Sequence, residues 1–187
     1  MHQVLNFWLK PVQTIELMDQ EEPGKLNQTI NILFSLIAIL FCLQQYCTIQ
    51  FSNNTDKLLK AMLCILSIPV MYLFLNYLMA YLHLLFSKLF QGESTIRQIR
   101  CVLAFALSPL LVFLPFVIFQ FFLVLLVPNL SASTNFSFEL ETVFNILILC
   151  YLIVGLTKVN KFSAGYGLAV AILAPSVIEL LIMLIKS

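Results

Sequence analysis

Few residues in this chain could do chemistry, and Glu179 is the foremost of them. It lies in the apolar run VIELLIMLIKS, and Lys186 follows seven residues later on the same helical face. An ionisable side chain inside a membrane-spanning helix indicates a functional site by default, because a charge at the helix centre costs about 2.5–3.5 kcal/mol. Three interpretations stay open: a hydrogen-bonded acid inside a bundle, a side chain that reaches the interface, and a proton or ion relay.

The sequence contains no recognised catalytic motif. There is no Walker loop, serine elbow or HExxH pattern. Glu139 and Glu141 are two residues apart and so face different sides of a helix, which argues against an acid/base pair. A zinc site at His83 would need at least two more ligands, and His2 and the five cysteines do not supply them at a recognised spacing. We therefore expect no catalytic residue, no metal, no cofactor and no enzymatic activity.

The composition explains why chemistry is scarce. Of the 187 residues, 61% are hydrophobic and only 10% are charged, whereas soluble domains have about 45–50% and 25%. Such a chain cannot cover itself with polar side chains, so its solvent is the lipid bilayer. The net charge of +1 excludes a nucleic-acid binder, which would carry a basic excess. Long apolar runs favour helices over the short alternating strands of an outer-membrane barrel, and the fold is predicted to be all-α.

Hydropathy predicts a polytopic bundle of about five transmembrane helices. Each span is judged against the roughly 20 residues that a hydrocarbon core requires. The predicted spans are about 30–49, 58–89, 99–127, 138–157 and 166–185. Residues 1–29 would then form a cytoplasmic leader, and residues 30–187 a single transmembrane domain.

Prolines are predicted to interrupt several of these spans. The second span exceeds the required length by several turns, and we expect a kink at Pro69 and an extension beyond the membrane. Pro109 and Pro115 each remove a backbone donor from the third span, which predicts a break there. Pro175 lies in the middle of the fifth span.

The leader is predicted to be amphipathic. Val4, Leu5, Trp8 and Leu9 share one side of a short helical stretch, and Pro11 suits the first position of a second one. We expect both stretches to lie in the membrane interface, with Trp8 at the depth of the headgroups. The alternative is a polar leader without fixed structure.

The distribution of cations predicts an N-in/C-out orientation. With the N-terminus inside, seven cations are cytoplasmic and three are outside. The inner set is Lys10, Lys25, Lys88, Arg97, Arg100, Lys158 and Lys161, and the outer set is Lys57, Lys60 and Lys186.

Small residues at intervals of four predict close helix packing, since they let two backbones approach. Three pairs have this spacing: Gly165 with Ala169, Gly167 with Ala171, and Ala104 with Ser108. Asn76 and Asn145 would need hydrogen-bond partners across helix interfaces. These contacts could lie within one bundle or between chains.

Three segments together resemble the Yip1 family of five-span membrane proteins. The leader FWLKPVQTIELM is similar to the amphipathic, proline-containing start of prokaryotic members. The stretch GESTIRQIRCVLAFALSPLL resembles a polar loop followed by an aromatic-small-x-x-Pro pattern, here Phe105 to Ser108 and Pro109. The stretch GLTKVNKFSAGYGLAVAILAP is similar to a Gly-Leu turn at Gly155, a short basic loop and a final helix rich in small residues.

The chain departs from the family pattern in informative places. Phe105 stands where tyrosine is usual, and Asn160 where histidine is common. The Asp-Leu-Tyr-Gly-Pro segment of eukaryotic members, which bind Rab GTPases, is missing. The resemblance therefore implies a prokaryotic protein of the cell membrane, and some bacterial relatives accompany export machinery.

Two classes of function follow. The first is a non-enzymatic scaffold or accessory subunit that lies in the lipid bilayer and binds another membrane protein or a second copy of itself. An export transporter would be one such partner. The alternative is a small transporter or channel that uses Glu179 and the proline-broken helices. A third hypothesis, membrane shaping by the leader, ranks last because four acids oppose two lysines there. The candidate functional or packing residues are Glu179, Pro109, Phe105, Ser108, Gly155, Gly165, Ala169 and Pro175.

Overall fold

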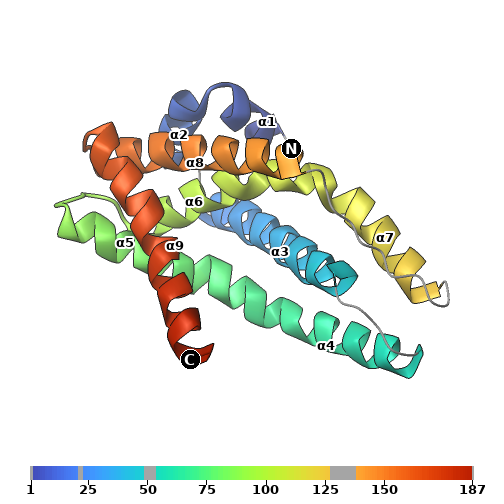
Figure 1. Cartoon of the computed structure of the whole chain (residues 1–187). Helices are drawn as coiled ribbons and strands as arrows, with labels where there is room; N and C mark the ends of the chain where they lie inside the picture. The colour runs from blue at the N-terminus through green and yellow to red at the C-terminus, as the bar shows by residue number, and fades with distance from the viewer. Residues whose placement is uncertain (1, 21–22, 49–53, 127–137, 187) are drawn as a thin grey trace.

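The computed structural model describes residues 2–20, 23–48, 54–126 and 138–186 (Figure 1). Within these residues the secondary structure is helical and contains no strand, which confirms the all-α prediction. The elements in chain order are α1 (His2–Leu9), α2 (Pro11–Gln20), α3 (Pro23–Thr48), α4 (Asn54–Leu73), the π-helical η1 (Phe74–Met79), α5 (Ala80–Leu89), α6 (Ile96–Leu107), the 3-10 helix η2 (Ser108–Phe113), α7 (Leu114–Leu126), α8 (Phe138–Asn160) and α9 (Ala164–Lys186).

Five helical stretches of the described residues are long and apolar enough to cross a membrane. They are Gly24–Cys47, Lys57–Leu89, Ile96–Leu126, Thr142–Asn160 and Ala164–Leu184. α3 packs against α4, α6 and α7, while α8 joins α6 to α9. The polytopic helical architecture is thereby confirmed, and the direction in which the chain crosses stays a prediction.

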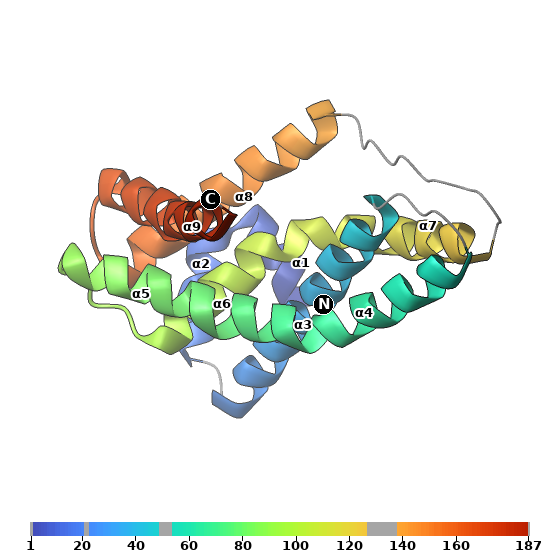
Figure 2. The same cartoon turned by 60° about the horizontal axis from the view of Figure 1, so that its bottom comes forward.

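The second stretch is interrupted by the π-helical turn η1. Pro69 lacks an N–H, yet α4 continues to Leu73 before the wider turn begins at Phe74. Figure 2 shows α4 and α5 following one another along one side of the molecule. The distortion therefore lies a few residues beyond the predicted kink at Pro69. It places Asn76 in a π turn, a geometry that is frequent at functional sites.

The third stretch breaks at Pro109, as the sequence predicts. α6 ends at Leu107, and Pro109 then lies at the start of the 3-10 segment η2. Pro115 occupies the first turn of α7, where a missing backbone N–H costs little. The start of α6 is well defined, because Thr95 and Gln98 form a reciprocal capping box.

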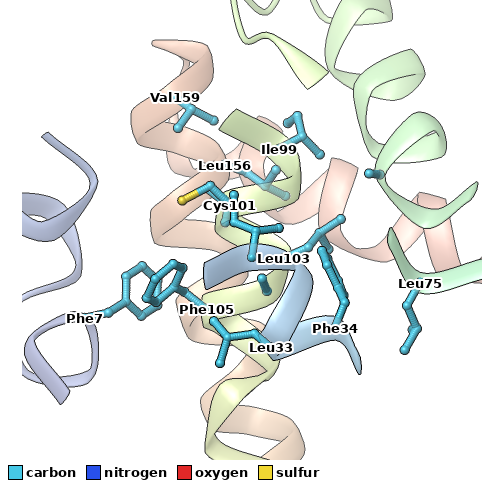
Figure 3. Packing of buried hydrophobic residues seen from close by; sticks show 14 of the residues in the cluster. Phe7, Leu33, Phe34, Leu75, Ile99, Cys101, Leu103, Phe105, Leu156 and Val159 are labelled. Carbon is cyan, nitrogen blue, oxygen red and sulfur yellow. The ribbon is translucent and has the colours of Figure 1, made fainter. Parts of the chain in front are cut away.

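The larger hydrophobic core lies where α1, α3, α6 and α8 meet (Figure 3). Its centre contains Phe34, Phe105 and Leu156, which are fully buried. A smaller cluster between α3, α4 and α7 includes Tyr46 and Phe121, whose ring centroids are 4.9 Å apart. Two of the candidate residues, Phe105 of α6 and Gly155 of α8, lie on these four helices.

Candidate functional site

One face of α9 packs closely on α8, and Gly167 makes that approach possible. A Cβ at Gly167 would overlap Thr157 Oγ1 and lie 3.1 Å from the carbonyl oxygen of Ile153. Ala171 and Ala174 are buried on the same side of α9. We call Gly167, Ala171 and Ala174 the closed face. The predicted pair of Gly167 and Ala171 therefore serves packing inside this chain.

The opposite face of α9 has a different character. Six residues follow one another at alternating intervals of four and three, the spacing of a helix-pairing stripe. They are Gly165, Ala169, Ile172, Ser176, Glu179 and Met183, and we call them the open seam. Every member is exposed except Ala169, which is half-buried. Three of the six are small or hydroxylated residues of the kind that lets a second backbone approach.

Gly165 has open space around it. The nearest atom that a Cβ there would meet is Ser163 Oγ, 3.9 Å away, which is ordinary contact. Ile172 is 46% exposed and Met183 is 67% exposed, so the seam is uncovered from Ile172 to Met183. The Ser176 hydroxyl donates to the carbonyl oxygen of Ile172 at 2.8 Å and is thus satisfied within α9. The pair of Gly165 and Ala169 is left available to another molecule.

Glu179 lies on this open seam and is exposed. Within the described part of the chain its carboxylate makes no hydrogen bond or ion pair. The predicted pair with Lys186 falls outside the described side chains. Pro175 is half-buried in the middle of α9 and removes the backbone bond to Ala171.

Gly155 marks a second close approach, between α8 and α6. It is buried, and a Cβ there would lie 2.5 Å from Val102 Cγ1 and 3.1 Å from Val102 Cγ2. A larger residue at this position would require Val102 to move. This candidate residue therefore packs the core.

Phe105 and Ser108 bind the leader. Phe7 is fully buried, and its ring centroid lies 5.4 Å from that of Phe105, with the two ring planes tilted by 44°; Figure 3 shows the two rings next to each other. The Trp8 indole Nε1 donates to Ser108 Oγ at 2.8 Å, and that hydroxyl donates to the Phe105 carbonyl oxygen at 2.6 Å. Tyr151 Oη in turn donates to the carbonyl oxygen of Trp8 at 2.7 Å. Pro109 is buried beside this contact.

This docking gives the leader a protein contact that the sequence does not predict, and its position in the membrane interface stays a prediction. Helical stretches exist and Pro11 begins the second, as predicted. The buried residue, however, is Phe7, while Leu9 of the predicted apolar side is 80% exposed. The Trp8 indole finds a protein acceptor in Ser108, so its N–H is satisfied without a lipid headgroup.

A polar cluster that the sequence did not reveal lies at the π turn. Arg100 Nε donates to Asn76 Oδ1 at 2.7 Å, and Arg100 Nη2 donates to Asn31 Oδ1 at 2.9 Å. Asn76 Nδ2 also donates to Asn31 at 3.3 Å, and the guanidinium lies 5.2 Å from the centre of the Tyr77 ring. Asn76 is fully buried, so its predicted role as a polar contact between helices is confirmed. The cation count places Arg100 on the cytoplasmic side, and its position just inside the predicted third span, which begins at 99, is the signal that it lies on a helix.

Two other polar candidates lie apart from this cluster. Asn145 is exposed on α8, so a partner across a helix interface stays a prediction. His83 is buried, with Nδ1 2.8 Å from the carbonyl oxygen of Met79. In the described residues no group of three or more His, Cys, Asp or Glu side chains is placed to hold a metal ion.

Two ion pairs lie at the end of the molecule where α6 begins. Lys158 on α8 lies 2.6 Å from Glu16 on α2, and Lys161 lies 2.7 Å from Glu93. The Lys161 ammonium lowers the pKa of Glu93, mainly through their hydrogen bond, and Glu93 raises the pKa of Lys161 for the same reason. The second pair ties the segment before α6 to the turn before α9.

Comparison with known proteins gives one match. The family model described as Yip1 domain matches residues 5–186, nearly the whole chain. Neither the curated proteins nor the solved structures include a match.

Proposed function

Since the chain belongs to the Yip1 family, we propose that this integral membrane protein is a non-enzymatic scaffold or accessory subunit that binds another membrane protein. The observation that carries the proposal is the open seam of α9. In this proposal, a transmembrane helix of the partner protein covers the open seam.

Glu179 is the strongest argument for a protein partner over lipid alone. It lies about 8 Å of helix rise inside the end of the apolar stretch at Leu184. A carboxylate that faces lipid tails at such a depth is costly, because hydrocarbon offers it no hydrogen bond. A partner helix with a hydroxyl, amide or cationic side chain at this level would satisfy it.

The small residues of the seam support the same proposal. Lipid tails are as apolar as leucine, so two helices associate in a membrane through fitted contacts and not through a hydrophobic driving force. Gly165 supplies such a surface where nothing in the described chain fills it, and the half-buried Ala169 lies one turn further along the same seam. An accessory subunit of an export transporter is the role that bacterial members suggest by analogy.

The test is crosslinking and pull-down of the full chain from native membrane, with Gly165→Leu and Gly24→Leu compared. Both glycines are exposed, and a Cβ at Gly24 would meet nothing within 4 Å, so the two variants change the same atoms without a clash. Gly165→Leu should reduce the captured partner about tenfold, and Gly24→Leu should leave it unchanged. Equal capture by the two variants would disprove the proposal, whichever protein is recovered.

Glu179→Gln gives the second arm of this experiment. It keeps the size of the side chain and removes the charge, so a partner that supplies a hydrogen-bond donor should be captured several-fold less. A crosslinked product of twice the mass of the chain would identify the partner as a second copy.

Transport is the second candidate, and the helix breaks favour it. The π turn η1 and the 3-10 segment η2 interrupt two of the apolar stretches, and the Arg100 cluster lies at the first of these breaks. Discontinuous helices can line a site for a solute. Flux into proteoliposomes decides between the candidates: transport through Glu179 requires that Glu179→Gln alter it.

The orientation and location belong to the proposal as well. We propose an N-in/C-out protein of the prokaryotic cell membrane. In a chain whose five native cysteines are replaced by serine, single cysteines introduced at Ser133 and at the exposed Ser163 should be labelled from the outside and the inside respectively, and the reverse labelling would overturn the orientation.

A further inference from the structure

A cavity of about 180 Å³ lies where the leader meets the start of α6. Its apolar wall includes Ile15 of α2, Leu26 of α3 and Val159 of α8, and Arg97 of α6 contributes the charged part. One water needs only about 10–15 Å³ of such space, so the cavity can hold a much larger group.

Arg97 has hydrogen-bond donors that nothing in the described chain satisfies. Its Nε and Nη2 atoms are buried and have no partner. A buried donor left unpaired is destabilising, and more so when it carries charge. The neighbouring Thr95 and Gln98 are bonded to each other in the capping box. The cavity therefore calls for an acceptor that reaches Arg97.

The described carboxylates near this end of the molecule are engaged elsewhere. Glu16 is paired with Lys158 at 2.6 Å, and Glu93 with Lys161 at 2.7 Å. Arg100, one turn further along α6, is bonded to two asparagine oxygens, while Arg97 has none. The two arginines of α6 thus differ: one is satisfied by the protein, and the other faces a cavity with its charge uncompensated.

We propose that this cavity binds a phosphate group through Arg97. The planar guanidinium presents parallel N–H donors that match two phosphate oxygens, and such charge-assisted pairs are stronger than neutral hydrogen bonds. The group comes from a phospholipid headgroup or from a free phosphate. The apolar wall suits the carbon atoms of a phosphate ester.

The test is calorimetric titration of the purified full chain in neutral detergent with dioctanoyl phosphatidylglycerol and, separately, with inorganic phosphate. Arg97→Gln should weaken binding about tenfold or more, because a charge-assisted pair is lost. Lys10→Gln is the matched control, since Lys10 is an exposed cation outside the cavity, and it should change the affinity less than about twofold.

The two titrations distinguish the sources. Arg97-dependent binding of the lipid with no binding of inorganic phosphate identifies a headgroup, and Arg97-dependent binding of inorganic phosphate identifies a free anion. Cys101→Leu fills the cavity without changing any charge, and it should also weaken binding. If Arg97→Gln does not fold, Cys101→Leu alone tests the proposal. Affinities within about twofold of the unmodified chain in whichever variants fold would overturn the proposal and leave water as the occupant.

Discussion

Gly165 and Gly167 lie two residues apart on α9 and have opposite surroundings. At Gly167 a Cβ would overlap Thr157, and at Gly165 it would meet a single atom at 3.9 Å. Each glycine is followed four residues later by an alanine, so the two pairs look the same in the sequence. About 200° of helical rotation separates them and places one on the closed face and the other on the open seam.

The difference shows that the two faces of α9 have different roles. Small residues on the closed face let α9 approach α8, and small residues on the open seam remain uncovered. The same spacing thus holds the fold on one side and, in the proposed function, binds a partner on the other. Substitutions that separate stability from partner binding test whether that division is real.

Gly167→Leu should have the largest effect. The new side chain would collide with the carbonyl oxygen of Ile153, which belongs to the backbone of α8 and cannot rotate away. We expect a loss of about 3 kcal/mol or more in the free energy of unfolding. Gly165→Leu should change it by less than about 0.5 kcal/mol. Thermal unfolding in detergent measures both, and equal losses would remove the distinction between the two faces.

Gly155→Ala extends the comparison to the contact between α8 and α6. The added methyl group would lie 2.5 Å from Val102 Cγ1, so we expect a loss of about 1–3 kcal/mol in the free energy of unfolding. Val102→Ala removes both methyl groups that it would meet. The double variant should therefore be more stable than the sum of the two single losses predicts. Strict additivity would mean that the two residues do not touch.

The sequence predicts the long elements of this fold well. Stretches of about 20 apolar residues are a strong signal, and a proline such as Pro109 has a local effect that no distant contact is needed to produce. The sequence also predicts the hydrogen bond of Asn76 to another helix, because a buried amide in hydrocarbon requires a partner.

The remaining features depend on contacts between distant segments. The Arg100 cluster joins residues of α3, η1 and α6, and a basic residue near a helix start is equally typical of a loop. Phe7 is buried because Phe105 and Tyr151 form its pocket, more than 90 positions away in the chain. The sequence could not separate Gly165 from Gly167 either, because the outcome depends on where α8 lies.

Trp8→Phe tests whether the contact between the leader and Ser108 stabilises the fold, as the contacts of the closed face do. The variant keeps an aromatic ring but loses the hydrogen bond to Ser108, which should lower the free energy of unfolding by about 1 kcal/mol. Ser108→Ala should show coupling with it in a double-mutant cycle, since the two groups share that bond. A leader that lies free in the interface predicts no coupling between the two positions.

Glu93→Gln should have the smallest effect, and it tests the ion pair that fixes the turn before α9. Lys161 lowers the pKa of Glu93, so the pair stabilises the fold above the ordinary glutamate pKa of about 4.3, and this contribution is lost as the pH falls through the lowered value. The Tm of Glu93→Gln should therefore lie slightly below that of the unmodified chain at pH 7, and the gap should close in acid. Because both groups are exposed, added salt should reduce the gap at pH 7 as well. A gap that persists unchanged in acid would show that Glu93 acts through packing and not through its charge.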